Sequence, residues 1–169
     1  MGEISPQLAD NEAWVDQTFE KCDDILHRQV YLGQGRQEGL LVYVEVAVSN
    51  LMLEEHVIGL SDVQPLKSYE EGKAALLAGN GLLFLDGDTN CYKISSKGYP
   101  GLGVKKAENE KVIRGSQEAF TESEKINVAL IRKRLRDSRM KVEEQTVGVR
   151  SHTMTALVYM EDLIYQGLL

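Results

Sequence analysis

The 169-residue sequence is poor in the residues from which metal and catalytic centres are commonly built. It has two cysteines, Cys22 and Cys91, and three histidines, His27, His56 and His152. Two cysteines do not make a disulfide framework, so we expect reduced thiols in a cytoplasmic protein. The histidines are scattered, and no HExxH, CxxC or nucleophile-elbow pattern occurs. We therefore predict no catalytic residue, no metal and no cofactor.

The sequence also lacks a long apolar run. Its longest apolar stretch, 40–48, is interrupted by Glu45 and is far shorter than the roughly 20 residues that cross a bilayer. The first 14 residues, MGEISPQLADNEAW, have neither the basic nor the apolar part of a signal peptide. The formal net charge of −7 makes non-specific nucleic-acid binding unfavourable. With 43% hydrophobic residues, we expect a soluble chain with a real core.

One loop imitates a calcium site incompletely. Asp86, Asp88 and Asn90 have the 1, 3, 5 spacing of an EF-hand loop, but position 6 is Cys91 and position 12 is Lys97. The glycine needed for the sharp turn and the bidentate glutamate are both missing. The same residues are typical of a hairpin turn, which is the interpretation we prefer.

Hydrophobic periodicity and end signals predict short strands between helices. The predicted helices cover 11–29, 50–57, 68–79 and 121–137, and the predicted strands cover 40–48, 81–87, 90–95, 140–148 and 153–160. Glycine-bearing 33–39 is predicted as a turn, and Pro65 as a boundary. Ser68 with Glu71, and Thr121 with Glu124, form capping boxes. The fold class predicted is α/β, with α+β as the alternative: a small mixed β-sheet flanked by helices.

A short repeat suggests how the chain is divided. LVYVE at 41–45 recurs as LVYME at 157–161, and five of fourteen positions match when 40–53 is laid over 156–169. Both copies run from a strand toward a helix start. We expect 1–120 to be a first subdomain, 121–138 a connector helix, and 139–169 the beginning of a related second subdomain. The second copy should be less well covered than the first, since the elements that would pack on it are missing.

The predicted connector carries the most unusual charge in the chain. Residues 125–141, KINVALIRKRLRDSRMK, hold seven basic residues and one acidic residue, a net charge of +6, so the remainder must carry −13. Arg132 and Arg136 are four apart and share a helix face. Arginine tolerates interfaces better than lysine does, because its planar group binds carboxylates bidentately. A solvated face, a contact between subdomains or subunits, and an anionic lipid headgroup all remain open.

The same region carries a family resemblance. VIRGSQEAFTESEKINVALIRKRLRD (112–137) resembles the signature of the A subunits of spore germinant receptors, the GerA family. The matching positions are Arg114, Gly115, Phe120, Glu122, Asn127, Ala129, Leu130, Ile131, Arg132, Arg134, Arg136 and Asp137. VYLG at 30–33 and VGVRSHTMTALVYMEDL at 147–163 resemble further segments of that family. Ser116, Ala119 and Ser138 depart from it, so the shape of the loop at 114–120 and the choice between a nutrient receptor and the stage V sporulation paralogue stay open.

The resemblance implies the cytosolic N-terminal domain of a germinant-receptor A subunit, without enzymatic activity. Such a domain would act in complex assembly and in signal coupling to a membrane channel during germination. Its partners would be the B and C subunits and other A subunits. It would lie on the spore-core side of the inner membrane, held there by membrane segments that this chain does not contain. We expect Arg132, Arg134, Arg136 and Asp137 to link subdomains or neighbouring subunits.

The residues themselves leave a second function open. Two sheet-and-helix subdomains joined by a helix can form a cleft, and clefts bind small molecules. The alternative is thus a germinant-binding module with its site between the subdomains, although no convergent polar cluster identifies the ligand-binding residues. An enzyme is the third class, and it would need at least two titratable groups converging in one pocket.

Overall fold

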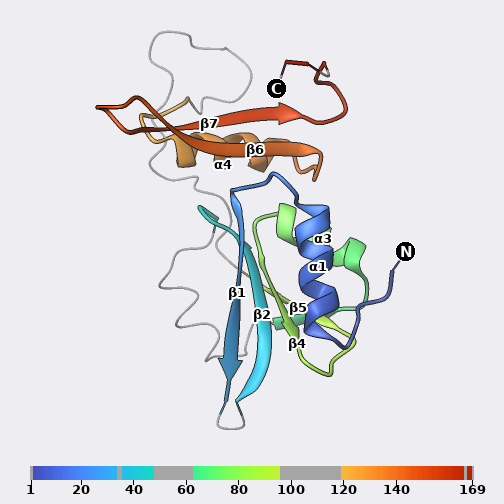
Figure 1. Ribbon diagram of the computed structural model, residues 1–169. Helices are drawn as coiled ribbons and strands as arrows, with labels where there is room; N and C mark the ends of the chain where they lie inside the picture. The colour runs from blue at the N-terminus through green and yellow to red at the C-terminus, as the bar shows by residue number, and fades with distance from the viewer. Residues whose placement is uncertain (1, 34–35, 48–62, 96–118, 166, 169) are drawn as a thin grey trace.

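The computed structural model describes residues 2–33, 36–47, 63–95, 119–165 and 167–168, and its elements form two groups (Figure 1). The first group contains helices α1 (Leu8–Thr18) and α3 (Tyr69–Leu77) with strands β1 (Ile25–Leu32), β2 (Gln37–Val44), β3 (Val63–Leu66), β4 (Gly81–Leu85) and β5 (Cys91–Ile94). The second contains helix α4 (Glu124–Arg134) and strands β6 (Met140–Val147) and β7 (Thr153–Met160).

The first group is a five-stranded sheet with two helices on one face. The strand order is β1-β2-β4-β5-β3, and each pair of neighbours is antiparallel. Helices α1 and α3 both pack against β2 and β4 (Figure 1). The prediction of a helix-covered sheet is confirmed in its α+β form. The prediction of a mixed sheet is wrong, because every pair of neighbouring strands in the described sheet is antiparallel and none of them forms a parallel βαβ unit.

The core lies around the two central strands. Leu40, Leu41 and Val42 are consecutive and all at most 1% exposed, so β2 is buried on both faces. On the helical side, Trp14 of α1 stacks on Tyr69 of α3 with ring centroids 4.5 Å apart. This stacking links the two helices on the same face of the sheet.

Several predicted elements are confirmed. The strands predicted at 81–87 and 90–95 are β4 and β5, and those at 140–148 and 153–160 are β6 and β7. Ser68 caps α3, since its hydroxyl accepts a hydrogen bond from the Glu71 N–H at 3.3 Å. Asp88 accepts hydrogen bonds from Asn90 and Tyr92, which lower the pKa of its carboxyl, so the supposed calcium loop has the bonding of a hairpin turn.

The helix predicted at 11–29 is wrong after its first half. Helix α1 ends at Thr18, Lys21 takes a positive φ of 58°, and Ile25 opens strand β1. Ile25 repeats the spacing of Phe19 and Cys22, which imitates a helical face. Eight paired positions with β2 outweigh that local pattern, as tertiary pairing often does.

Other boundaries shift less. The helix predicted at 121–137 is α4, which begins after Ser123 rather than at a Thr121 cap and ends at Arg134. Pro65 lies within β3 instead of at a boundary, on an edge strand where its missing N–H costs no ladder bond. The helix predicted at 50–57 lies outside the described residues.

Two hairpins of the molecule have the same pairing along their strands. In each, eight residues pair with eight, and LVYV (41–44) and LVYM (157–160) are the last four residues of the second strand. After each second strand, the N–H of Glu45 donates to the backbone carbonyl of Asp24 and that of Glu161 donates to the backbone carbonyl of Arg139, both at 2.9 Å. The repeated sequence therefore occupies equivalent structural positions.

The repeat differs in burial, as expected. Leu41 is 0% exposed, whereas Leu157 at the equivalent position is 44% exposed. Strand β2 is flanked by β1 and β4, but β7 has β6 as its only neighbour among the described residues. The prediction of weaker cover on the second copy is confirmed.

Candidate functional site

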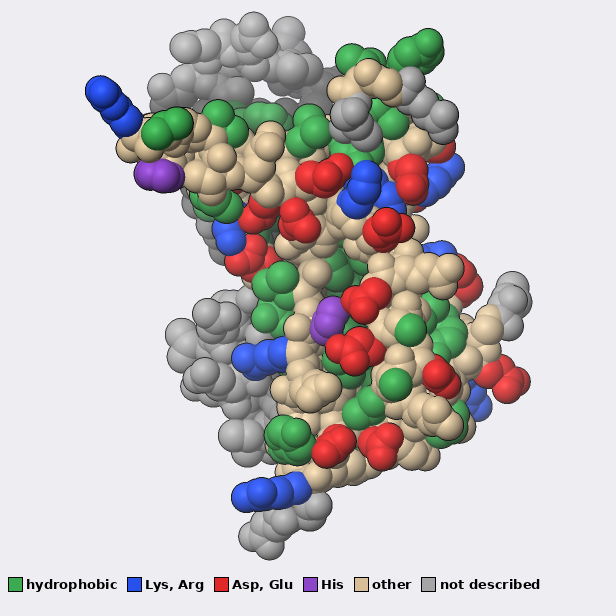
Figure 2. Space-filling model, in the orientation of Figure 1, with side chains coloured by type: hydrophobic (Ala, Val, Ile, Leu, Met, Phe, Trp, Pro, Cys, Tyr) green, Lys and Arg blue, Asp and Glu red, His purple; other side chains and the backbone are tan. Residues whose placement is uncertain are grey.

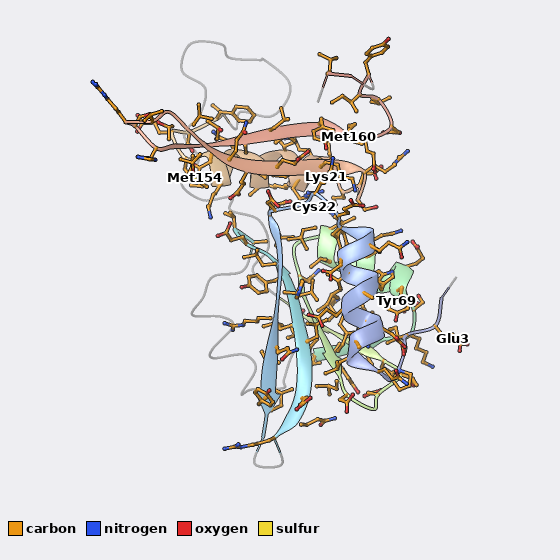
Figure 3. The ribbon with its side chains drawn as sticks, viewed as in Figure 1. Glu3, Lys21, Cys22, Tyr69, Met154 and Met160 are labelled. Atoms are coloured by element: carbon orange, nitrogen blue, oxygen red, sulfur yellow. The ribbon has the colours of Figure 1, made fainter. Side chains whose placement is uncertain are left out.

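The two groups of elements meet at a junction made by three segments of the chain. These are Lys21–Asp24, which connects α1 to β1, the last turn of α4, and the start of β6 with the residues just before it. Figure 3 shows Lys21 and Cys22 at the boundary between the β6–β7 hairpin and the sheet below it. We use the word junction for these segments.

Backbone hydrogen bonds connect the two groups of elements across the junction. The N–H of Val142 donates to the carbonyl of Lys21 at 2.8 Å, and the N–H of Asp23 donates to the carbonyl of Val142 at 2.9 Å. These bonds surround a parallel bridge between Cys22 and Val142. The segment before β1 thus acts as a short third strand beside β6, and it ties the second group to the first.

A buried ion pair lies behind this backbone link. Arg132 is 0% exposed and Asp24 is 4% exposed. The guanidinium binds the carboxylate bidentately: Nε donates to Oδ2 at 2.8 Å and Nη2 donates to Oδ1 at 2.7 Å. Nη1 donates to the carbonyls of Asp137 at 3.1 Å and Met140 at 3.0 Å. One side chain of α4 thereby joins the first sheet to the start of β6.

The environment of Arg132 keeps it charged. Burial alone would lower the pKa of its guanidinium, but the hydrogen bonds and negative charge of Asp24 outweigh burial and raise it. Removing one member of such a pair leaves the other charge buried, which typically costs about 3–5 kcal/mol. The pair therefore makes separation of the two groups costly.

Cys22 completes the buried part of the junction. Its thiol is 4% exposed and lies 3.5 Å from the carbonyl of Met140, to which it donates. Burial raises the pKa of Cys22, so the thiol stays protonated at neutral pH. Cys22 acts here as a packed donor rather than as a nucleophile.

The rim of the junction is half-exposed and charged. Lys125 of α4 binds Glu45, the residue that follows LVYV, at 2.6 Å. Burial raises the pKa of nearby Glu144. Acidic side chains gather across the middle of the visible face in Figure 2, where the two groups meet. A hollow lined by Glu45, Lys125 and Glu144 has a volume of about 10 Å³, room for about one water molecule.

The predicted site residues have different surroundings. Arg132 lies in the junction, and Asp137 contributes its carbonyl there while its carboxylate binds Arg139. Arg134 and Arg136 are exposed, and Arg136 donates to the carbonyl of Lys133 at 3.2 Å.

The remaining predicted residues precede or open α4. Asn127 holds the chain before the helix, since its side chain bonds both the N–H and the carbonyl of Thr121. Phe120 is 69% exposed and Glu122 is also exposed. Arg114 and Gly115 lie outside the described residues.

Sequence reasoning missed Asp24 and Cys22. Both lie inside the helix wrongly predicted at 11–29, and no role was predicted for Asp24. The local feature that marks the position is that Asp23 and Asp24 are adjacent acids directly before Ile25, the first residue of β1. The partner of Asp24 is 108 positions away, which no local pattern could show.

Fold and junction together define an α+β domain in which a second sheet is attached to the first through a buried arginine–aspartate pair. The family model described as Bacillus/Clostridium GerA spore germination protein matches residues 13–169. The chain therefore belongs to the GerA spore germination family. No helix among the described residues is long and apolar enough to cross a membrane.

Curated relatives agree with this assignment. The chain is 29% identical over 182 residues to the uncharacterized membrane protein YfkQ of Bacillus subtilis, covering 95% of this chain and 35% of that protein. It is 33% identical over 103 residues to stage V sporulation protein AF of the same organism, covering 61% and 21%. It is 24% identical over 184 residues to spore germination protein KA, covering 95% and 34%. The chain thus spans about a third or less of these relatives' lengths.

A solved structure supports the fold. The crystal structure of the N-terminal domain of the A subunit of the Bacillus megaterium spore germinant receptor GerK3 aligns with a TM-score of 0.73 at 18% identity. The alignment covers 98% of this chain and 69% of that chain. Both the five-stranded sheet and the β6–β7 hairpin therefore have counterparts in a known receptor domain.

Proposed function

We propose that this chain is the N-terminal domain of a germinant-receptor A subunit and that it acts in complex assembly and signal coupling. One observation supports this role above others: Arg132 and Asp24 bind each other out of water between the two groups of elements. A displacement of the hairpin must either move the first sheet or break this pair. The junction is therefore suited to transmit a change from one part of the domain to the other.

The proposal includes the division of the chain and the setting of the domain. We assign 1–120 to a first subdomain, 121–138 to a connector and 139–169 to a second subdomain of related design. Receptor B and C subunits and other A subunits are the proposed partners, and the spore-core side of the inner membrane is the proposed location. We propose no enzymatic activity, because Asp24, Arg132 and Cys22 are all engaged in structural bonds.

Substitutions at Arg132 test the coupling role. Arg132→Lys keeps the charge but loses the bidentate fork, and Arg132→Met leaves Asp24 buried without a partner. We expect Arg132→Met to lower the free energy of unfolding by about 3–5 kcal/mol, and Arg132→Lys by less. Spores whose gene carries Arg132→Lys should germinate more slowly than wild-type spores at equal levels of folded protein.

Arg136→Ala is the matched control, because it removes an exposed arginine just beyond the end of the same helix. It should leave the stability of the isolated domain measurably unchanged, and slower germination of spores that carry it would indicate a contact of Arg136 with a neighbouring subunit. If Arg132→Lys spores germinate at the wild-type rate while the domain is measurably destabilised, the pair is structural only and the coupling role is wrong.

A second function has one observation in its favour. An open hollow of about 320 Å³ lies beside the junction, within the size range of small-molecule sites. Val15, Phe19 and Ile25 line its apolar part, while Asp16, Glu20 and His27 line its polar part. Calorimetric titration with candidate germinants tests it: saturable micromolar binding that is lost in Phe19→Asp would favour a binding module, and no heat would oppose it.

A further inference from the structure

Glu144 places a carboxylate on the apolar face of β6. Alternate residues of a strand share a face, so Glu144 lies on the same side as Met140 and Val142, which form a buried cluster with Val128 of α4. Its side chain lines the small hollow at the rim of the junction, and Val128 lines that hollow too. A position at which an apolar side chain would pack well therefore carries an ionisable group.

The charge of Glu144 is only partly compensated. Lys125 lines the same hollow, but its ammonium group binds Glu45 at 2.6 Å. Arg132, the buried cation of the junction, is bound bidentately by Asp24. Within the described part of the chain, the carboxylate of Glu144 has no hydrogen bond or ion pair of its own.

The charged groups that face Glu144 come from three elements and are mostly acidic. Helix α4 contributes Glu124 and Lys125, the residue after β2 is Glu45, and the segment before β1 contributes Asp23. Because Glu45 and Asp23 belong to the first group of elements, their repulsion of Glu144 acts across the junction. Burial of the side chain, and then repulsion by these acids, raise the pKa of Glu144 against the attraction of Lys125.

The backbone of Glu144 holds its side chain in this acidic surrounding. The N–H of Glu144 donates to the carboxylate of Asp23 at 2.7 Å, a bond that also crosses the junction. The two residues are thus tied through one backbone bond while their negative charges repel each other. A proton on Glu144 removes the repulsion and turns its carboxyl group into a hydrogen-bond donor, for which the carboxylates of Asp23 and Glu45 are acceptors.

We propose that Glu144 is a proton-responsive switch in the junction. Uptake of one proton from the solvent by its carboxylate holds the β6–β7 hairpin more firmly on the first sheet, and release of that proton loosens the attachment. This names a regulation of the junction and so rests on the coupling role proposed above. It can nevertheless fail separately, because its tests use the purified chain, whereas the coupling role is tested by the germination of Arg132→Lys spores.

Protonation of Glu144 favours the attached hairpin at low pH. A glutamate whose pKa in the folded chain is raised above its usual 4.5 stabilises the fold in its protonated form. That contribution is fully present below pH 4.5 and is lost as the pH rises through the raised pKa. The hairpin should therefore be held more firmly near pH 4.5 than at pH 7.

Amide hydrogen exchange followed by NMR measures the attachment locally. The N–H groups of Asp23 and Val142 donate across the junction, so they exchange when it opens. Their protection factors, corrected for the intrinsic exchange rate at each pH, should fall between pH 4.5 and pH 7 in the wild type. Most of this fall should be absent in Glu144→Gln. Glu38→Gln is the matched control, because it removes an exposed glutamate at the end of β2 that lies away from the junction, and it should behave as the wild type.

A Glu45→Gln background supplies the second test. At pH 7, Glu144→Gln should raise the urea midpoint of the wild type, because it removes a poorly compensated charge. In the Glu45→Gln chain, Lys125 is released to bind Glu144, so the same substitution should no longer raise the midpoint. Protection factors of Asp23 and Val142 that do not change with pH in the wild type would overturn the proposal. A fall of equal size in Glu144→Gln, or an equal rise of the midpoint in both backgrounds, would overturn it as well.

Discussion

The hairpins β1–β2 and β6–β7 have strands of the same length, the same pairing along those strands and the same last four residues in all but one position, yet they differ in what surrounds them. Leu41 is completely buried and Leu157 is almost half-exposed. Just before each first strand, Asp24 is buried against Arg132 while the equivalent Arg139 is exposed between Asp137 and Asp162. The local sequence determines that a hairpin forms. The elements packed around the hairpin determine how much each of its residues contributes to stability.

The largest expected difference in the loss of unfolding free energy is between substitutions at Asp24 and at Arg139. Asp24→Ala leaves the Arg132 guanidinium buried without a carboxylate and should cost about 3–5 kcal/mol. Arg139→Ala removes two exposed ion pairs, with Asp137 and Asp162, and should have a much smaller effect. Urea denaturation measures both. Adding Arg132→Met to Asp24→Ala should recover much of the loss, since no charge then remains buried; a double variant as unstable as Asp24→Ala would contradict this explanation.

The second largest difference in stability loss is expected between alanine substitutions at Leu41 and at Leu157. Leu41→Ala should cost about 2–5 kcal/mol, because it leaves a cavity in a strand covered on both faces. Leu157→Ala should cost about 1 kcal/mol or less, because much of that side chain already contacts water. Equal losses in denaturation experiments would mean that β7 is as well covered as β2.

A smaller difference is expected at the two turns. Gly33 and Gly148 follow the first strand of each hairpin and have φ of 67° and 90°. An alanine in this left-handed region costs about 1–2 kcal/mol. At Gly148 the added Cβ would also overlap the Ser151 hydroxyl, whereas at Gly33 it would meet no atom of the described residues within 4 Å. Gly148→Ala should therefore cost more than Gly33→Ala, and Ser151→Ala should remove the excess.

The smallest effect concerns pH. Hydrogen bonds from Arg139 lower the pKa of Asp137 to about 2. A lowered pKa means that the carboxylate stabilises the fold above its usual pKa of 3.8 and loses that contribution as pH falls through about 2. Because the pair is largely solvent-exposed, we expect less than about 1 kcal/mol. The stability difference between wild type and Asp137→Asn should shrink between pH 5 and pH 2, and a constant difference would argue against the pair.

Sequence patterns predicted elements well where local and tertiary preferences agree. The capping residue Ser68, the strands at 81–95 and the repeat at LVYV and LVYM all correspond to observed geometry. The sequence patterns failed at 19–29. There the spacing of Phe19, Cys22 and Ile25 is typical of a helix, but residues from Ile25 onward pair with β2 and form strand β1.

The candidate site was only half predictable. The arginine cluster stands out in the sequence, yet Arg132, Arg134 and Arg136 look alike there. What distinguishes them is the direction of each side chain at the end of α4 and the presence of Asp24 at one of these places. That information is tertiary, so motif resemblance identified the segment but not the residue that crosses the junction.

The reactivity of the two cysteines, Cys22 and Cys91, would report how often different parts of the molecule open. Cys22 donates to Met140 within the junction, while Cys91 lies in the central sheet with a pKa raised by burial to about 12. Alkylating reagents attack the thiolate of an exposed cysteine, so each residue can react only when its surroundings open. The ratio of their labelling rates in the unmodified chain would therefore compare how often the hairpin lifts from the sheet with how often the sheet itself unfolds.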